Sequence, residues 1–209
     1  MRSVLVLLAV CACGKPSRNS LDLDLVRITG QGKMRTDTIG DTVQETATFV
    51  LVDAQNTGKD GAYITLAGDL VDADKKPVGD FKPTSLYIPA GEIRTFALVD
   101  RERKPRPTAL GAKIVVRSAT IPEKTPPASV DQVKEIEDNG KLVVQGVLHK
   151  TAERKGQIVV IGSFHGEDGR PMTRPFAIVT VPPHTDQPVQ FVSQPCAKHG
   201  TIYVGEVSY

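Results

Sequence analysis

Tryptophan is absent from this chain, and aromatic residues make up only 5% of it. The sequence therefore lacks the rows of aromatic rings on which sugars or bases stack in many binding sites. No charge of one sign dominates either, because 26 lysines and arginines face 24 aspartates and glutamates. A chain this close to neutrality builds no strong positive field, so we expect no nucleic-acid partner.

Cysteine is also scarce, with Cys11 and Cys13 near the N-terminus and Cys196 near the C-terminus. If the first two belong to a cleaved signal, Cys196 has no partner for an intramolecular disulfide unless Cys11 survives processing. We expect Cys196 to be a small buried apolar residue rather than a redox centre.

Long apolar runs are missing, and the run at residues 4–10 has only seven residues. A helix needs about 20 residues to cross the hydrocarbon of a membrane, so this run is too short for a retained anchor. It follows a positively charged start and precedes a polar, proline-containing stretch at residues 14–20, an order typical of a secretory signal peptide. A buried strand is the alternative, but the polar stretch separates the run from the first expected strand.

A cysteine directly after a small residue makes this segment resemble the signal of a bacterial lipoprotein. Cys13 is the better acceptor, since Ala12 precedes it, whereas Cys11 would place the branched Val10 in a subsite for small residues. The resemblance implies a signal peptide over residues 1–12, lipidation of Cys13 and a tether over 13–19. It implies a bacterial cell-envelope protein whose partner is the membrane, the outer membrane being favoured, and which faces the periplasm or the cell surface.

The rest of the chain contains two copies of one unit. Residues 56–70 align without a gap with residues 150–164, and the same order of strand, turn, strand and proline continues beyond them. This shared order indicates a duplication. The matched pairs include Thr57 and Thr151, Ile64 and Ile158, Leu66 and Val160, Gly68 and Gly162, Leu70 and Phe164, Asp74 and Asp168, and Pro77 and Pro171.

Both copies alternate between apolar and other residues with a period of two, which is typical of β-strands. Several short strands separated by glycine and proline turns favour an immunoglobulin-like sandwich, and the missing Cys…Trp…Cys pattern excludes the antibody type. We therefore predict an all-β fold with two tandem immunoglobulin-like β-sandwiches. The expected parts are a first sandwich over 20–119 whose first strand is 21–28, a proline-rich linker over 120–129, and a second sandwich over 130–209 whose first strand is 130–136.

The alternation also predicts which residues face the two cores. We expect Gly68 and Gly162 to face inward, each beside a phenylalanine of a following strand, Phe96 or Phe191. Each copy should own a core, so residues from about 130 onward should fold alone. The inward set of the second copy is Ile158, Val160, Gly162 and Phe164, and its outward set is Val159, Ile161, Ser163 and His165.

Residues 70–74 and 164–169, each a hydrophobic strand end followed by an acidic turn, resemble the FxLYD-type domains of bacterial surface and lipid-anchored proteins. In the first copy, the turn at residues 88–92 and the strand with Phe96 complete the resemblance. Val71 and His165 stand where that family usually has tyrosine. The resemblance implies small immunoglobulin-like modules, and its motifs are turn and packing signals that carry no chemistry.

Four histidines are the first candidates for a metal site, and all of them lie in the second copy. Cys196 and His199 even have a spacing seen in metal sites, but zinc requires three or four convergent ligands. The alternation places His149 and His165 on outward faces, and His184 lies in a turn. Scattered surface histidines are therefore favoured over a shared metal.

Acidic and basic clusters offer weaker candidates. Asp22 and Asp24 would share one face of a strand and could do acid–base chemistry, but a half-buried edge strand explains them better. The carboxylates of Asp69, Asp72 and Asp74 hint at calcium, yet lysines follow directly and no ligand-rich loop does. The basic loop at residues 100–107 could touch anionic lipid phosphates, although a solvated loop is the simpler interpretation.

No catalytic motif, phosphate loop or metalloprotease helix is recognisable in the sequence. We therefore expect no catalytic, cofactor-binding or metal-binding residue, and no cofactor. The favoured function is a non-enzymatic, lipid-anchored envelope protein that acts as a scaffold, adhesion or assembly module with a protein partner. The alternative is a periplasmic carrier of a small ligand or metal that uses the histidine-bearing second copy.

We predict that mass spectrometry of the mature N-terminus will find Cys13 linked to lipid. More than one acyl chain is expected, since a single chain binds membranes only marginally. Cys13→Ser should abolish the modification and release the protein from membranes. An unmodified N-terminus inside the fold, or a Cys13→Ser protein that is still acylated, would contradict the assignment.

Overall fold

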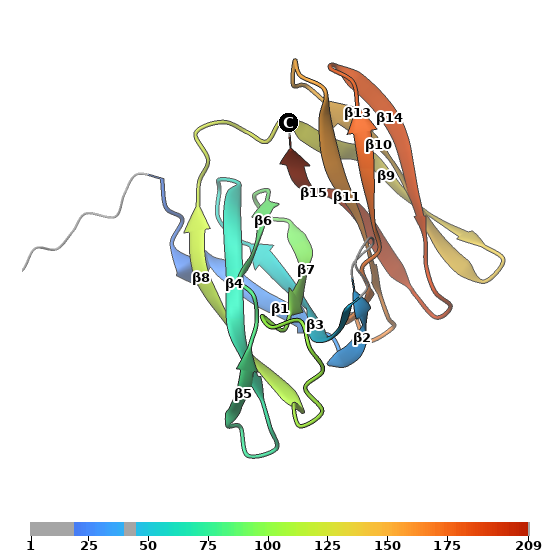
Figure 1. Ribbon diagram of the computed structural model, residues 1–209. Coiled ribbons are helices and arrows are strands. Elements are labelled where there is room, and N and C mark those ends of the chain that lie inside the picture. The colour runs from blue at the N-terminus through green and yellow to red at the C-terminus, as the bar shows by residue number, and fades with distance from the viewer. Residues whose placement is uncertain (1–18, 40–44, 209) are drawn as a thin grey trace, which may run out of the picture.

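Two antiparallel β-sandwiches lie side by side in the computed structural model, which describes residues 19–39 and 45–208 (Figure 1). The chain is all-β, as predicted, and the only helical element among these residues is the short 3-10 helix η1 (Leu23–Leu25). The predicted signal peptide, Cys13 and most of the tether lie outside the described residues. Within those residues, no helix has the length and apolar character to span a membrane.

The first sandwich has two sheets of the same design. In each sheet a long central strand pairs with one strand on one side and with two shorter, successive strands on the other. One sheet contains β1 (Val26–Gln31), β2 (Arg35–Ile39), the central β3 (Glu45–Asn56) and β7 (Ile93–Val99). The other contains the central β4 (Ala62–Val71), β5 (Pro77–Asp80), β6 (Thr84–Ile88) and β8 (Gly111–Thr120).

The second sandwich repeats this plan with one unbroken first strand. Its first sheet contains β9 (Ala128–Asp138), the central β10 (Lys141–Lys150) and β14 (Thr185–Val192). Its second sheet contains the central β11 (Gly156–His165), β12 (Pro171–Thr173), β13 (Phe176–Val181) and β15 (His199–Ser208).

The two sandwiches share irregularities as well as strands. The register of β4 against β8 shifts between Thr65 and Leu66, and that of β11 against β15 shifts between Val159 and Val160. These positions coincide in the gap-free alignment of the two copies. Related domains usually keep their β-bulges at the same positions. The recurrence of this bulge at matched positions therefore supports a duplication of the whole unit.

A matched pair of buried polar side chains also supports the duplication. Asn56 at the end of β3 donates from Nδ2 to the carbonyl oxygen of Ile88 at 3.0 Å. Lys150 at the end of β10 donates from Nζ to the carbonyl oxygen of Val181 at 2.7 Å. In both copies this carbonyl belongs to the residue before a proline, and the side chain supplies a hydrogen bond to it at the end of the strand.

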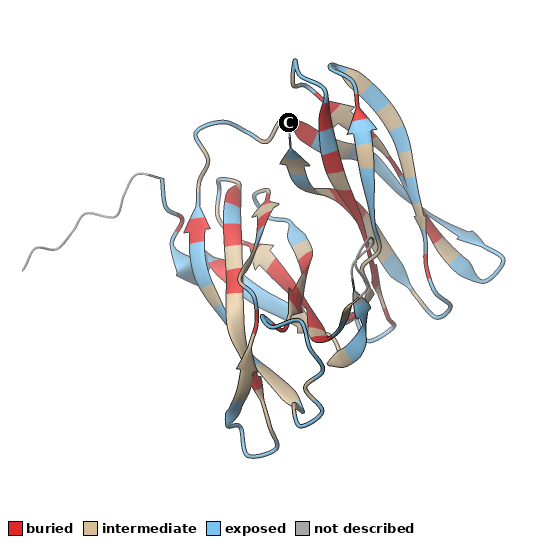
Figure 2. Ribbon diagram, in the orientation of Figure 1, coloured by how far each residue is buried: buried red, intermediate tan, exposed pale blue. Residues whose placement is uncertain are grey.

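The predicted inward faces are correct, and the predicted outward face of β11 is only partly so. Ile158, Val160 and Phe164 are fully buried in the second sandwich. However, Ile161 and Ser163 are also buried, at 2% and 0% exposure, because the outer face of β11 packs against the first sandwich (Figure 2). Alternation shows which residues share a face, but it does not show what covers that face.

The N-terminal strand expected at residues 21–28 begins later than predicted. Asp22 caps η1, because its Oδ1 accepts a hydrogen bond from the backbone N–H of Asp24 at 3.1 Å. An aspartate that binds its own backbone favours a turn over an extended strand, so Asp22 and Asp24 do not line one strand face. At the other boundary, β9 begins at the buried Ala128, inside the predicted linker.

Gly162 and Gly68 are crowded for different reasons. A methyl group at Gly162 would lie 2.7 Å from Cγ of Phe191, which is the close approach that the sequence predicts. At Gly68 it would lie 2.1 Å from the backbone carbonyl oxygen of Lys113 on β8, so the expected role of Phe96 is wrong. Both positions therefore require glycine, one because of a side chain across the sandwich and one because of a neighbouring strand.

Gly162→Val should lower the free energy of unfolding by about 1–3 kcal/mol, because the new side chain overpacks the core against Phe191. Gly68→Val should cost at least as much, because a backbone carbonyl cannot rotate away. Denaturant melts of both variants check this, with Thr65→Val as a control that adds β-propensity on the outer face of β4. A stabilised Gly162→Val protein would contradict the packing described here.

Candidate functional site at the junction of the sandwiches

Four buried or half-buried polar side chains join the two sandwiches. Asp53 on β3 and Thr95 on β7 are directly opposite in their sheet, while Ser163 and His165 share one face of β11. The hydroxyl of Thr95 donates to Oδ1 of Asp53 at 2.6 Å, and the Oγ of Ser163 lies 2.5 Å from that of Thr95. Nε2 of His165 lies 3.0 Å from Oδ2 of Asp53. We call these four residues the polar lock.

The backbone of Thr95 is held from the second sandwich as well. Its carbonyl oxygen accepts from the hydroxyl of Tyr203 at 2.7 Å and from Nε of Arg174 at 2.7 Å, and its N–H donates to the Tyr203 oxygen at 3.2 Å. The guanidinium of Arg94 lies 4.8 Å from the centre of the Tyr203 ring, within cation–π range. Among the described strands β7 pairs only with β3, so these side chains cap an otherwise open edge.

The polar lock contains serine, histidine and aspartate, the residue types of many hydrolases. In a hydrolytic triad the histidine binds the serine hydroxyl and the aspartate orients the histidine. Here the hydroxyl of Ser163 is bonded to Thr95, and Ser163 has no solvent exposure. The geometry of this cluster therefore suits the attachment of two domains and does not suit nucleophilic attack.

A groove of about 640 Å³ runs beside the lock, between β2, β3 and β7 of the first sandwich and the β12–β13 segment of the second. Its apolar lining comes from both sandwiches, with charged groups at Arg35, Asp37 and Arg174. The apolar residues that line it include Phe49, Leu51, Val99, Met172, Phe176 and Val192.

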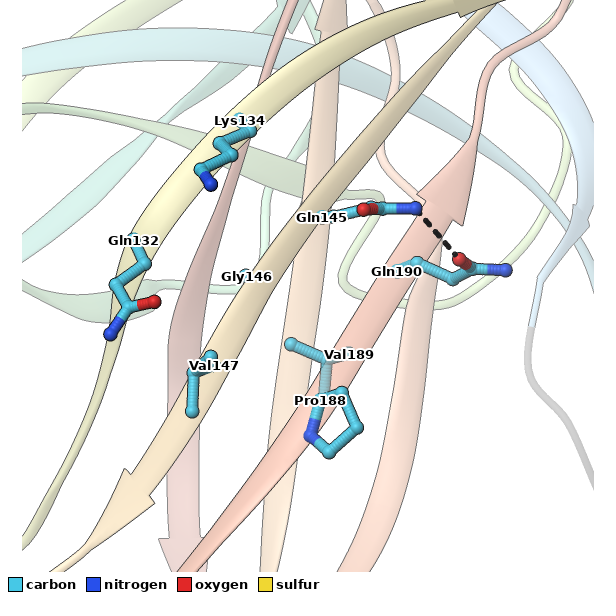
Figure 3. Close-up of a pocket in the computed structure, with 8 residues that line it drawn as sticks. All are labelled: Gln132, Lys134, Gln145, Gly146, Val147, Pro188, Val189 and Gln190. Carbon is cyan, nitrogen blue, oxygen red and sulfur yellow. Dashed lines mark hydrogen bonds between the residues drawn. The ribbon is translucent and has the colours of Figure 1, made fainter.

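A second hollow of about 440 Å³ lies on the outer face of β9, β10 and β14 (Figure 3). Nε2 of Gln145 donates to Oε1 of Gln190 at 3.3 Å across it. Gly146 lies at a register shift between β9 and β10, where a methyl group would be 2.7 Å from Val130. Lys134 is the one charged residue among those lining the hollow: Gln132, Lys134, Gln145, Gly146, Val147, Pro188, Val189 and Gln190.

The histidines do not converge. Nδ1 of His149 lies 2.6 Å from Asp186 and its Nε2 lies 3.5 Å from Asp131, so the two carboxylates lie on opposite sides of the ring. His165 belongs to the polar lock. Across residues 19–39 and 45–208, no three histidine, cysteine, aspartate or glutamate side chains are grouped so that they could hold a metal ion.

Cys196 is exposed rather than buried, so that prediction was wrong. It lies in the turn between β14 and β15, outside both sheets, and has a positive φ of 75°.

The carboxylate of Asp72 also stabilises a turn, because its Oδ1 accepts from the N–H groups of Asp74 and Lys76, both at 2.9 Å. A carboxylate used in this way supports the turn interpretation over a calcium site.

The cations of the basic loop at residues 100–107 pair with carboxylates of the loop and of neighbouring strands. Arg106 donates from Nε to the buried Asp100 at 2.7 Å, and this bond raises the pKa of Arg106. Hydrogen bonds from Lys104 and then from Arg106 lower the pKa of Glu102. Neighbouring carboxylates thus offset the cations that would attract a lipid phosphate. The other ion pairs of the loop are Arg101 with Asp80, Arg103 with Glu45, and Lys104 with Glu102.

The fold and the junction define a class of protein: an all-β chain with two β-sandwiches joined through a buried polar interface. No protein-family model matches the chain, and no curated protein is significantly similar to it. The resemblance to FxLYD-type domains therefore stays a prediction.

Sequence reasoning drew attention to His165 only as a surface residue, and it missed Asp53 and Thr95, which no local pattern distinguishes.

We predict that Asp53→Ala lowers the free energy of unfolding by about 1–3 kcal/mol, because it leaves Thr95 and His165 without their buried acceptor. A double-mutant cycle with His165→Ala should show coupling between Asp53 and His165. The exposed pair of His149 and Asp186 is the matched control, and its coupling should be below about 1 kcal/mol. Equal coupling in the two pairs would contradict a role for the lock in joining the sandwiches.

Proposed function

We propose that this protein is a non-enzymatic, lipid-anchored scaffold of the bacterial cell envelope that presents its two sandwiches to a protein partner as one rigid unit. The observation that carries the proposal is the polar lock. Asp53, Thr95 and Ser163 are buried at the junction and bonded across it. Tandem domains without such an interface move relative to each other, whereas satisfied buried polar groups impose one orientation.

The attachment of the chain to its expected anchor is consistent with a scaffold held close to a membrane. The carbonyl oxygen of Asn19 accepts from the N–H of Ile121 at 2.8 Å, and Ser20 bridges to Thr120. The start of the described chain, the end of β8 and the linker therefore lie together at one end of the first sandwich (Figure 1). From a lipidated Cys13, six residue steps reach Asn19 and span at most about 20 Å.

This short tether has a consequence for the partner. The end of the first sandwich with Asn19 would lie near the headgroups, while the β4–β5 turn and the loop at residues 100–107 lie at the other end of β4 and β8. The polar lock fixes the second sandwich to the first, so the surfaces of the second sandwich are held at a set distance from the membrane. A partner would thus meet two domains in a fixed arrangement rather than two independent modules.

The alternative function, a carrier of a small ligand or metal, has less support in the geometry. The carboxylates around His149 lie on opposite sides of its ring. The hollow on β9, β10 and β14 is lined mainly by neutral amides and small apolar groups and is open to solvent. A broad, shallow surface with one charged side chain is more typical of a protein contact than of an enclosed ligand site.

Cross-linking in the host cell tests the scaffold. A photoreactive residue at Gln190 should capture a defined partner in the native protein. The lock variant Asp53→Ala with Ser163→Ala should remain lipidated and in the membrane fraction but lose that complex, because its sandwiches are no longer held together. Arg101→Ala with Asp80→Ala removes an exposed ion pair of the first sandwich away from both the lock and Gln190, so it is the control and should keep the complex.

Circular dichroism first confirms that the lock variant is folded. If it is not, Ser163→Ala with His165→Ala takes its place, because these changes remove both lock bonds across the junction and leave the carboxylate of Asp53 bonded to Thr95. The proposal fails if the native protein forms no complex, or if the unlocked protein forms it as well as the native one.

A further inference from the structure

One edge of the second sandwich lacks the usual protection against pairing with another strand. β13 pairs with β11 on one side, and among the described strands none pairs with its other side. Its residues 176–181 carry no charge and contain no proline. An uncharged edge of high β-propensity is a template for another strand, and proteins normally protect such edges with charge, proline or cover.

The other edges of the described sheets have such protection. β6 is uncharged as well, but β15 of the second sandwich lies close to it. β12 has only three residues. The remaining edge strands carry charged residues: Arg27 on β1, Arg35 and Asp37 on β2, Asp80 on β5, Arg94 on β7, Lys113 and Arg117 on β8, Asp131, Lys134 and Glu135 on β9, Asp186 on β14 and Glu206 on β15.

The open edge also displays apolar side chains. Phe176 and Ile178 are 47% and 50% exposed. They are directly opposite Ile161 and Val159 of β11, so they lie on the outer face of the sheet. Ile161 is covered by the first sandwich, but Phe176 and Ile178 extend beyond that cover, and Phe176 continues into the groove beside the lock.

We propose that β13 pairs antiparallel with β13 of a second copy of this chain, which forms a two-fold symmetric dimer. The absence of charge argues for a second copy, because β13 paired with itself opposes only apolar and hydroxyl groups in any register. A two-fold axis brings identical surfaces together, so the same strand meets itself.

The pleat restricts the register, and contact between the two exposed Ile178 side chains then sets it. Directly opposite residues of an antiparallel pair point to the same face. The two-fold axis must therefore lie midway between the two copies of one residue, so that this residue is directly opposite itself. An axis at Ile178 places the two Ile178 side chains against each other. It also places Phe176 opposite Thr180 and Ala177 opposite Val179, so the outer and inner faces continue from one copy to the other.

The same register gives the groove an occupant. Continued past the strand, it places Pro182 of one copy beside Arg174 of the other and Pro183 beside Thr173. Both Arg174 and Thr173 line the groove, and both prolines are exposed. The prolines also end the ladder, since they have no N–H to donate. Five paired residues in each strand and one proline turn form a small contact, so we expect weak association in the micromolar range.

Sedimentation velocity tests the dimer on the chain from residue 14 onward, which contains all of the described strands and both cores. The protein should change from monomer to dimer as its concentration rises to a few hundred micromolar. Ile178→Lys should weaken association by about tenfold or more, because it sets two like charges directly opposite each other. Val115→Lys on β8, at 47% exposure, is the matched control and should change association less than about twofold.

Disulfide cross-linking tests the register, with Cys196→Ser as background so that the introduced cysteine is alone. Ile178→Cys should form a covalent dimer on mild oxidation, since opposite Cα atoms of an antiparallel pair are about 4.5–5.5 Å apart. Thr180→Cys lies on the same face, but the two copies of residue 180 would be about 13 Å apart along the strands and should not cross-link.

A protein that stays monomeric at every concentration overturns the proposal. So does a dimer that Ile178→Lys leaves intact, which would place the contact elsewhere. Cross-linking through residue 180 in preference to 178 would overturn the register centred on Ile178.

Discussion

A buried carboxylate determines how the two halves of this protein fit together. Asp53 is 3% exposed, and one of its oxygens is bonded to Thr95 of its own sandwich while the other faces His165 of the second. A carboxylate removed from water is costly unless its oxygens are bonded. The first sandwich alone satisfies only part of that need, so the second sandwich completes the environment of a residue it does not contain.

Other features of the junction follow from this arrangement. The open edge of β7 is capped by Tyr203 and Arg174, whose side chains bind the backbone of Thr95. Ile161 and Tyr203 join the apolar cluster of the first sandwich although they belong to strands of the second. Polar bonds set the orientation at the junction, and the apolar contacts around them remove water, which strengthens those bonds. The expected linker is thus accompanied by a packed interface.

The two sandwiches share one plan, yet a single such junction is present among the residues that the structure describes. The first sandwich uses the outer face of β3 and β7, and the second uses the outer face of β11. The matching face of the second sandwich, on β10 and β14, carries Val147 opposite Pro188 and is the open hollow of Figure 3. The two copies kept a common backbone, including their bulges, while side chains on the outer faces diverged. One pair of faces became complementary and the equivalent faces remained free.

Sequence alone determined the all-β class, the order of strands and turns, and the inward residues of β4 and β11, and it predicted the duplication. These features depend on local alternation and turn chemistry, which a few neighbouring residues in the sequence are enough to show. Tertiary structure alone decided the rest. Asp53 and Thr95 are far apart in the chain from Ser163 and His165, and no spacing links them. Cys196 became a turn residue and Asp22 a helix cap, because local hydrogen bonds and backbone conformation prevailed over pattern. Whether an outward face meets water or another domain depends on packing, which alternation does not encode.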